Sequence, residues 1–254
     1  MSNLDNLKNA WEGLAERDAL NAILTDGSKV GGKWDVADFM ATGDAEIQTV
    51  MNHLAAIGRT PNSNGAALDF GCGVGRLTQA LARRFASCVG VDISQQMVQK
   101  ADALNRYAHC RYVASSAAPL PFPDASFSFI YSNIVLQHVP RRFSKEYLRE
   151  FVRLLAPDGI LAFHISSQYL DLEPVLAREA QQAGMHAVTV HSGADENRGI
   201  FVADWVLLTN NEPFLAQPDM NRAAHPSILR SNVSLWTDDY SSILPILKWP
   251  PHTR

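Results

Sequence analysis

The chain has 254 residues, of which 46% are hydrophobic and 19% are charged, and a chain of this length buries a full hydrophobic core without metal or disulfide support. Its 22 basic and 26 acidic side chains leave a net charge of −4, and no run of Lys and Arg is present, which argues against a nucleic-acid-binding surface. The three cysteines form no CxxC pair, which indicates a reducing compartment and neither a disulfide framework nor a cysteine-based zinc site.

The sequence predicts neither a membrane span nor a secretion signal. Its longest apolar stretch, residues 199–208, is interrupted by Asp204 and is much shorter than the roughly 20 residues that cross a bilayer. The first residues lack the basic-then-apolar layout of a signal peptide. We therefore expect a cytoplasmic protein with neither a membrane nor a nucleic acid as partner.

The first 58 residues are predicted to be helical. Apolar side chains recur at three- and four-residue steps over residues 4–14, and a group of glycines at 27–32 ends this pattern. A second helix is expected to follow Gly43 and to end near Gly58. We interpret residues 1–58 as a helical lid, which a loop over residues 59–65 joins to the next segment.

Residues 59–209 alternate strands with helices and are predicted to form the core. This order indicates a three-layer Rossmann-like α/β sandwich, with a mostly parallel seven-stranded sheet and an antiparallel last strand. Residues 210–254 hold six of the 13 prolines and are expected to form an extended arm packed over the core. The expected strands lie at 66–70, 88–92, 111–113, 127–133, 160–165, 186–190 and 200–208, and the helices between them at 76–86, 95–105, 144–155 and 172–183.

A glycine loop with the spacing GxGxG follows the first expected strand, in the stretch LDFGCGVGRLT (68–78). Gly71, Gly73 and Gly75 allow the backbone to turn sharply and to approach a ligand closely, because they carry no Cβ. A dinucleotide fingerprint would need a glycine where Arg76 stands, and no Gly-Lys-Ser/Thr follows, so a nicotinamide site is weakened and a Walker loop is excluded. Asp69 can accept hydrogen bonds from an ammonium group or from loop amides.

A second acidic residue, Asp92, ends the next expected strand. An acid about 20 residues past a glycine loop is well placed to bind both ribose hydroxyls. Because ligands of open α/β sheets bind at the carboxyl ends of the strands, the loop and Asp92 indicate one nucleoside-bearing ligand. A tight turn and a capping aspartate are the alternatives for either motif alone.

Four stretches together resemble the class I S-adenosylmethionine-dependent methyltransferases, type 11 small-molecule branch, over residues 64–167. They are LDFGCGVGRLTQAL, VGVDIS, PLPFPDASFSFIYSNIVLQHV and LREFVRLLAPDGILAF. The resemblance implies S-adenosylmethionine as cofactor, with its methionine part in the glycine loop and its ribose on Asp92. The further cofactor-binding residues that it implies are Cys72 in the loop, Ile93 and Met97 at the adenine face, Ser116 and Ala117 at the adenine amino group, and Asn133 at the amino-acid end.

The chain departs from this family at two positions. Ser116 and Ser128 stand where the family usually carries an acid. A hydroxyl at Ser116 can still accept a hydrogen bond from the adenine amino group, but without charge, so we expect weaker adenine binding.

His138 is the best candidate for a general base. Methyl transfer from a sulfonium depends mostly on positioning and dehydration, and a base is needed only when the acceptor arrives protonated. His138 follows the fourth expected strand, at the ligand edge of the sheet, and histidine titrates near neutral pH. A structural role is the alternative, and His164 is a weaker candidate. No histidine shows metal-ligand spacing, so no metal site is expected.

Two segments outside the motifs are candidates for the acceptor site. The aromatic stretch WDVADFMATG (34–43) is expected to close over the cofactor, with core packing as the alternative. The run LWTDDY (235–240) could line a pocket for a cationic or amine substrate, with a helix cap as the alternative. The predicted substrate-binding residues are Trp34, Phe39, Gln137, Tyr169, Asp238 and Tyr240.

The sequence therefore predicts methyl transfer to an N, O or C nucleophile of a small molecule. One alternative is attack on the aminobutyrate carbon of the same cofactor, by aminopropyl-type transfer or ring closure, which releases methylthioadenosine; the aromatic and acidic tail favours it. The other is a non-catalytic cofactor-binding regulator, which the missing acids at 116 and 128 favour.

Overall fold

The structure is a computed structural model that describes residues 3–56, 60–116, 118–133, 135, 138–165, 170–192, 203–216, 218, 224–235, 242 and 244–248. The chain divides into two compact units, the first with residues 1–54 and 60–156 and the second with residues 55–59 and 157–254. The predicted boundaries at 58 and 209 stay predictions. Among the residues that the structure describes, no helix combines the length and the apolar character that crossing a bilayer requires.

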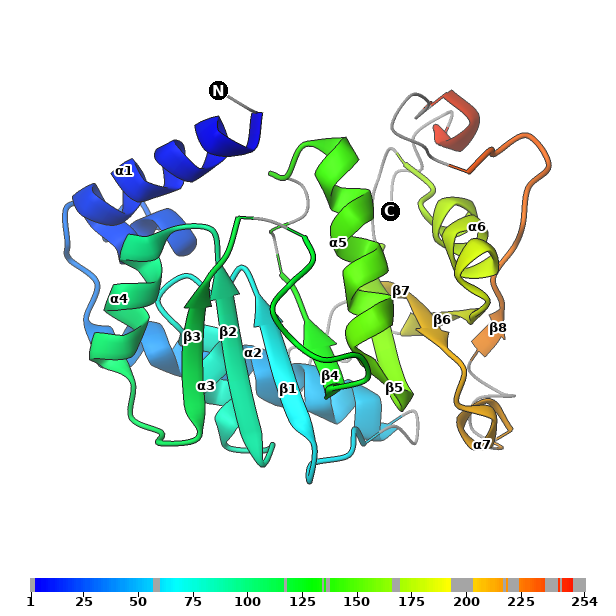
Figure 1. The fold of residues 1–254 in the computed structure, drawn as a ribbon, viewed down its shortest axis with the longest axis horizontal. Helices are drawn as coiled ribbons and strands as arrows, with labels where there is room; N and C mark the ends of the chain where they lie inside the picture. Colours follow the sequence, from blue (N-terminus) through cyan, green and yellow to red (C-terminus); the bar gives the residue numbers. More distant parts are fainter. Residues whose placement is uncertain are drawn as a thin grey trace. The chain divides into compact units, whose positions relative to one another are not determined.

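The first unit contains four parallel strands in the order β3-β2-β1-β4 (Figure 1). Four of the five residues of β1 are buried, as expected for a strand covered on both faces. The parallel arrangement brings the carboxyl ends of these strands to one edge, so the glycine loop after β1 and Asp92 at the end of β2 lie together. The strand bounds are β1 Ala66–Phe70, β2 Ser87–Asp92, β3 Cys110–Ala114 and β4 Phe127–Tyr131.

Helices lie on both faces of these strands, with α2 on the opposite face from α5 (Figure 1). On the α5 face, Phe70 of β1 packs against Tyr147 and Phe151, at ring-centroid distances of 4.6 and 5.0 Å. The strand–helix alternation confirms the predicted α/β class. The helices of this unit are α1 Asn3–Ile23, α2 Val36–Ala56, α3 Arg76–Ala82, α4 Gln95–Leu104 and α5 Arg141–Leu154.

Helix α2 corrects one sequence-based expectation, because it begins at Val36 and continues through Gly43. A Cβ at Gly43 would lie 2.5 Å from the backbone oxygen of Arg76. The glycine therefore allows close approach of α2 to α3 and does not mark a helix start. In contrast, the glycines before α2 do lie in turns: Asp18 accepts hydrogen bonds from the amides of Gly31 and Gly32, at 2.8 and 2.9 Å.

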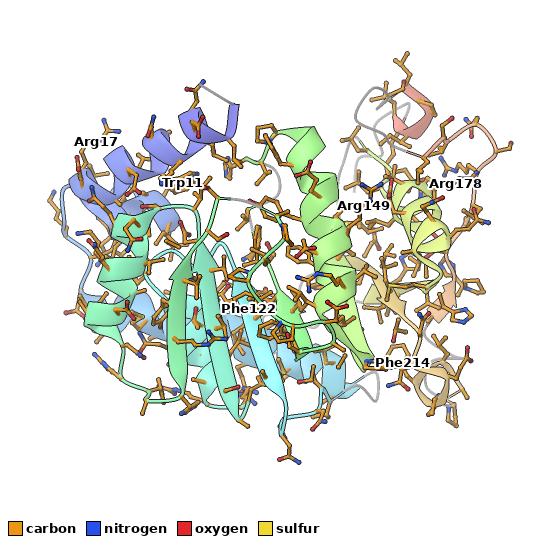
Figure 2. The ribbon with its side chains drawn as sticks, viewed as in Figure 1. Trp11, Arg17, Phe122, Arg149, Arg178 and Phe214 are labelled. Carbon is orange, nitrogen blue, oxygen red and sulfur yellow. The ribbon has the colours of Figure 1, made fainter. Side chains whose placement is uncertain are left out.

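The second unit is built on antiparallel pairing, in the order β5-β7-β6-β8. A buried cluster that includes Val190, Leu207 and Phe214 (labelled in Figure 2) forms its core. Arg178 of α6 donates to the backbone oxygens of Val233 and Arg230, at 3.3 and 3.1 Å, which fastens the chain beyond β8 to this helix. The bounds are β5 Leu155–His164, α6 Glu173–Ala183, β6 His186–Ser192, β7 Ala203–Thr209, α7 Glu212–Leu215, β8 Ala224–Pro226 and η2 Leu244–Ile246.

The described residues therefore form eight strands, where seven were expected. The additional strand β8 lies in the segment predicted to be an extended arm, and it pairs with β6. It has only three residues, one of them Pro226, and so short a segment carries no detectable alternation of apolar and polar residues.

Candidate functional site

The glycine loop adopts a conformation that only glycine accommodates readily. Gly71, Gly73 and Gly75 have φ values of 80°, 52° and 83°, in the left-handed region. A Cβ at Gly71 would lie 2.2 Å from a methyl carbon of Val135, and a Cβ at Gly73 would lie 2.4 Å from Cδ1 of Ile23. The loop is thus closely packed against Val135 and Ile23, and the predicted approach of its backbone to a ligand stays a prediction.

Asp92 joins the loop to the end of β2. Its Oδ2 accepts a hydrogen bond from the amide of Gly73 at 2.8 Å, and its Oδ1 accepts one from the amide of Ser94 at 2.9 Å. Burial raises the pKa of Asp92, although these two amides act to lower it. Each carboxylate oxygen has a second lone pair, so a partly exposed Asp92 can accept from two further hydroxyl groups.

Asp69 has an internal position instead. Its side chain is 1% exposed, and it accepts a hydrogen bond from the Thr78 hydroxyl at 2.6 Å. Burial raises the pKa of Asp69 to about 7, while the Thr78 hydrogen bond opposes this effect. The carboxyl group ties β1 to α3, an arrangement that does not support the predicted contact with a bound ammonium group.

An apolar cluster lies beside the loop and includes two of the predicted site residues, Met97 and Phe39, which are 1% and 0% exposed. Phe39 makes an edge-to-face contact with Trp34 at a centroid distance of 5.6 Å. Its full burial corresponds to core packing, the alternative to a substrate-binding role. The indole of Trp34 donates to the backbone oxygen of Leu24 at 3.2 Å, so this ring also has a structural partner. Ile93 is partly buried.

Helix α1 contributes a residue that the sequence analysis missed, Glu12. Its carboxylate accepts hydrogen bonds from the Ser94 hydroxyl at 2.8 Å and from the amides of Gln95 and Gln96 at 2.8 and 3.1 Å. These donors form the N-terminus of α4, whose capping residue Ser94 lies two residues after Asp92. Partners more than 80 residues apart leave no local signal in the sequence, so no motif could have revealed this contact.

Helix α2 contributes a second missed residue, Glu46, at the other end of the edge. One carboxylate oxygen accepts from Tyr131 at 3.0 Å and from the side-chain amide of Asn133 at 2.6 Å, and the other pairs with Arg76 at 2.8 Å. The predicted cofactor residue Asn133 is thereby fixed after β4. Its amide oxygen is an acceptor suited to an ammonium group.

His138 lies just past β4, as predicted, and its side chain is exposed. Its amide donates to the backbone oxygen of Val135 at 2.9 Å. The imidazole meets the indole of Trp11 edge to face, at a centroid distance of 5.9 Å. Trp11 belongs to α1 (Figure 2), so the N-terminal helix contacts both the Asp92 end of the edge and the candidate base.

The two serines that depart from the family pattern have different surroundings. Ser116 is exposed and follows Ser115, whose amide donates to the backbone oxygen of Asp92 at 2.9 Å. Ser128 is 8% exposed and donates to the backbone oxygens of Asn62 and Ala66, at 2.9 and 3.2 Å, near the start of β4. It thus closes the amino end of the strand, away from the ligand edge.

Several predicted residues lie outside the described part of the chain, and their placement stays a prediction. They are Ala117, Gln137, Tyr169, Asp238 and Tyr240. The exposure of His164 is likewise outside the description.

Comparison with known proteins identifies the segment that carries the motifs. Residues 68–163 match the family model described as Methyltransferase domain, which confirms the resemblance on which the sequence analysis relied. The chain is 33% identical over 135 residues to a trans-aconitate 2-methyltransferase from Methylobacterium radiotolerans, covering 52% of this chain and 50% of that protein. It is 38% identical over 98 residues to 24-methylenesterol C-methyltransferase 2 from Oryza sativa, covering 37% of this chain and 26% of that protein. The chain thus spans half or less of the length of these relatives.

Solved structures confirm the Rossmann-like fold. Magnesium protoporphyrin IX methyltransferase from Synechocystis PCC 6803, crystallised with SAM, superposes with a TM-score of 0.56 at 19% identity, covering 82% of this chain and 97% of that one. Phosphoethanolamine N-methyltransferase 1 from Haemonchus contortus, in complex with phosphoethanolamine and S-adenosylhomocysteine, also gives a TM-score of 0.56, at 14% identity, covering 91% of this chain and 51% of that one.

Proposed function

Because residues 68–163 match a methyltransferase domain, we propose that this protein transfers the methyl group of S-adenosylmethionine to an N, O or C nucleophile of a small molecule. The observation that carries the proposal is the contact between Asp92 and the amide of Gly73, which joins an acid to a glycine loop at the carboxyl edge of parallel strands. The relatives named above act on small molecules, a sterol and trans-aconitate, which supports a small-molecule acceptor.

The hydrogen-bonding groups at this edge suit the proposed cofactor. The two remaining lone pairs of the Asp92 carboxylate suit the ribose hydroxyls, and the loop between Gly71 and Gly75 is the proposed backbone contact of the methionine part. Asn133 is the proposed partner of the amino-acid end. The residues proposed to contact adenine are Ile93, Met97, Ser116 and Ala117. When bound, the cofactor supplies a methyl group on a positively charged sulfur, and this sulfur becomes a neutral thioether when the methyl group is transferred.

His138 is the proposed general base. Its exposed imidazole can remove a proton from an acceptor that arrives protonated, and Trp11 restricts the orientation of the ring. The remaining proposed acceptor-binding residues are Trp34, Gln137, Tyr169, Asp238 and Tyr240.

The test is the identity of the nucleoside product. Purified protein is incubated with S-adenosylmethionine, alone and with pooled cell metabolites, and the products are identified by mass spectrometry. S-adenosylhomocysteine that appears only with metabolites supports methyl transfer, and the mass shift of the consumed metabolite then identifies the acceptor. The D92A protein serves as the matched negative control.

Two other outcomes would overturn the proposal. Methylthioadenosine above the no-enzyme background, especially without an added acceptor, would mean attack on the aminobutyrate carbon. Binding of S-adenosylmethionine by calorimetry, with neither product formed from broad metabolite pools, would instead indicate a cofactor-binding regulator.

A further inference from the structure

Two histidines of the second unit meet on one face of its antiparallel strands. The Nε2 atom of His191 on β6 lies 3.1 Å from the Nε2 atom of His225 on β8. The strand register pairs His225 with Thr189, so His191 is its diagonal neighbour two residues along β6. Such neighbours lie on the same face of a sheet and within reach of one another.

The other nitrogen of each ring faces a group that accepts a hydrogen bond. Nδ1 of His191 lies 2.7 Å from Oδ1 of Asp204, a residue that is 9% exposed. Nδ1 of His225 lies 3.2 Å from the backbone oxygen of Pro226 and 3.9 Å from Oε1 of Glu173. A backbone carbonyl and an ionised carboxylate cannot donate, so each neutral ring carries its hydrogen on Nδ1.

Both Nε2 atoms therefore present lone pairs to each other. Two neutral rings in these tautomers cannot form a hydrogen bond through Nε2, because neither nitrogen carries a proton there. A short contact of this kind is favourable only when a positive species lies between the nitrogens. A metal ion and a shared proton are the two candidates.

We propose that His191 and His225 form a two-histidine site for a divalent transition metal ion such as Zn²⁺ or Cu²⁺. Imidazole nitrogen is a preferred ligand of both ions. Zn–N bonds of about 2.0–2.1 Å at a tetrahedral angle place two nitrogens roughly 3.3 Å apart, so the 3.1 Å separation needs little adjustment. The Nδ1 partners, a carboxylate and a backbone carbonyl, are those that orient metal-bound histidines.

Water would complete the coordination of the ion. Among the described residues, no group of three or more His, Cys, Asp or Glu side chains is arranged to hold a metal. The two imidazole side chains are 59% and 42% exposed, so solvent reaches the open positions. The bound ion would cross-link β8, which has only three residues, to β6.

The test measures metal binding by the full chain without an affinity tag, after chelator treatment and dialysis. Zn²⁺ is titrated by calorimetry, and Cu²⁺ is added for electron paramagnetic resonance, in which bound imidazole gives nitrogen hyperfine structure. We expect one ion per chain, and an affinity at least tenfold lower in both H191Q and H225Q. His186, another exposed histidine on β6, pairs with Glu212 at 2.9 Å, so H186Q is the matched control and should bind like the wild type.

A fourth variant tests the orienting carboxylate. D204N leaves both ligands in place but weakens the partner of His191, and it should lower the affinity for Zn²⁺ by about tenfold, as loss of such partners does in metalloproteins. Circular dichroism of each variant shows whether the fold is intact.

Three results would overturn the proposal. Equal affinity in the wild type, H191Q and H225Q would place the ion elsewhere, and an equal loss in H186Q would mean that binding is not specific to this pair. No binding of either ion by the wild type, with nuclear magnetic resonance showing one proton shared by the two rings, would assign the contact to a proton-bridged pair. None of these measurements depends on methyl transfer.

Discussion

The two N-terminal helices each place a glutamate at the ligand edge of the first unit, but the two carboxylates are bound differently. Glu12 of α1 accepts three hydrogen bonds from uncharged donors at the start of α4. Glu46 of α2 is paired with Arg76, whose side chain is only 8% exposed. Uncharged donors that lose their partner can bind water, whereas a buried cation that loses its partner stays unpaired at a cost of about 3–5 kcal/mol.

The two kinds of contact predict different mobility for the two helices. The ion pair with Arg76 holds α2 against α3, and the hydrogen bond from Tyr131 holds it against β4. We therefore expect α2 to keep its position. Helix α1 packs on the glycine loop through Ile23 and contacts His138 through Trp11. Its hydrogen bonds at Glu12, however, cost little free energy to break, because water can replace them. We therefore expect α1 to be the part that moves when a cofactor enters or leaves.

The strongest effect is expected at Glu46 of helix α2, in the variant E46Q. The variant keeps the shape of the side chain but leaves the Arg76 guanidinium without its counter-charge, so we expect a loss of about 3 kcal/mol in the free energy of unfolding. Urea denaturation measures it. The matched control is D44N on the same helix, whose partner Arg83 is 58% exposed; that pair should contribute less than about 1 kcal/mol. Equal losses in the two variants would show that Glu46 is no more important than a surface residue.

The next effect concerns His138 under α1. Without the imidazole, H138A should lose about 100-fold in turnover, the usual contribution of a general base, while its affinity for S-adenosylmethionine stays within twofold. Steady-state kinetics and calorimetry separate the two quantities. W11F, which keeps an aromatic ring against His138, is the control and should retain most of the turnover. Turnover of H138A equal to that of the wild type across pH 6–9 would leave His138 a structural role only.

A smaller effect is expected at Asp92, which ends β2 beside the contact of α1 with Ser94. D92A removes a charged acceptor for two hydroxyl groups, and its affinity for S-adenosylmethionine should fall at least tenfold, or about 1.4 kcal/mol. Titration calorimetry measures the change. D69N serves as the comparison, because Asp69 is internal and its substitution should change affinity much less. An unchanged affinity in D92A would contradict the proposed cofactor site.

The smallest effect on stability is expected in E12Q. Loss of a carboxylate that caps a helix costs about 1 kcal/mol, and a loosened α1 should let S-adenosylmethionine associate faster in stopped-flow measurements. E16Q, one turn further along α1, weakens an exposed contact from Gln96 and should leave the association rate unchanged. If E12Q associates no faster than the wild type, α1 does not limit access.

Glu12 also makes the stability of the fold depend on pH. Burial acts to raise the pKa of Glu12, but the hydrogen bonds from Ser94, Gln96 and Gln95 outweigh it, and the pKa lies below its usual value. A carboxylate with a depressed pKa stabilises the fold above its unfolded pKa, and this contribution is lost as the pH falls through the folded one. The stability difference between the wild type and E12Q should therefore be constant near neutral pH and shrink below about pH 4.3. A difference that grows in acid would contradict this sign.

The sequence was most informative where local pattern and structure coincide. The strand at Ala66–Phe70 was predicted with its observed bounds, because a short buried run directly before a glycine loop has few other interpretations. The meeting of Asp92 with the loop followed from the topology of parallel strands. The start of α2 was predicted wrongly, since a glycine that allows close helix packing and a glycine that breaks a helix look alike in a sequence.

Contacts between distant segments could not be predicted. Glu12 and Glu46 belong to no motif in the sequence, and only the folded chain shows that they reach α4 and Asn133. His191 and His225 likewise have no ligand spacing in the sequence, because β7 and the chain around it separate them by 34 residues. The role of a residue with a long-range partner can be assigned only once the fold shows which segments lie together.

The rates at which the buried thiols are alkylated report on opening and unfolding of the protein. Cys72 lies inside the glycine loop at 5% exposure, and burial raises the pKa of its thiol well above the usual value, so alkylating reagents should react with it slowly. Cys88 and Cys110 are buried as well, on β2 and β3. Alkylation of Cys72 alone would time an opening of the loop, and alkylation of all three together would time unfolding, so peptide mass mapping of a single reaction distinguishes the two events without any engineered probe.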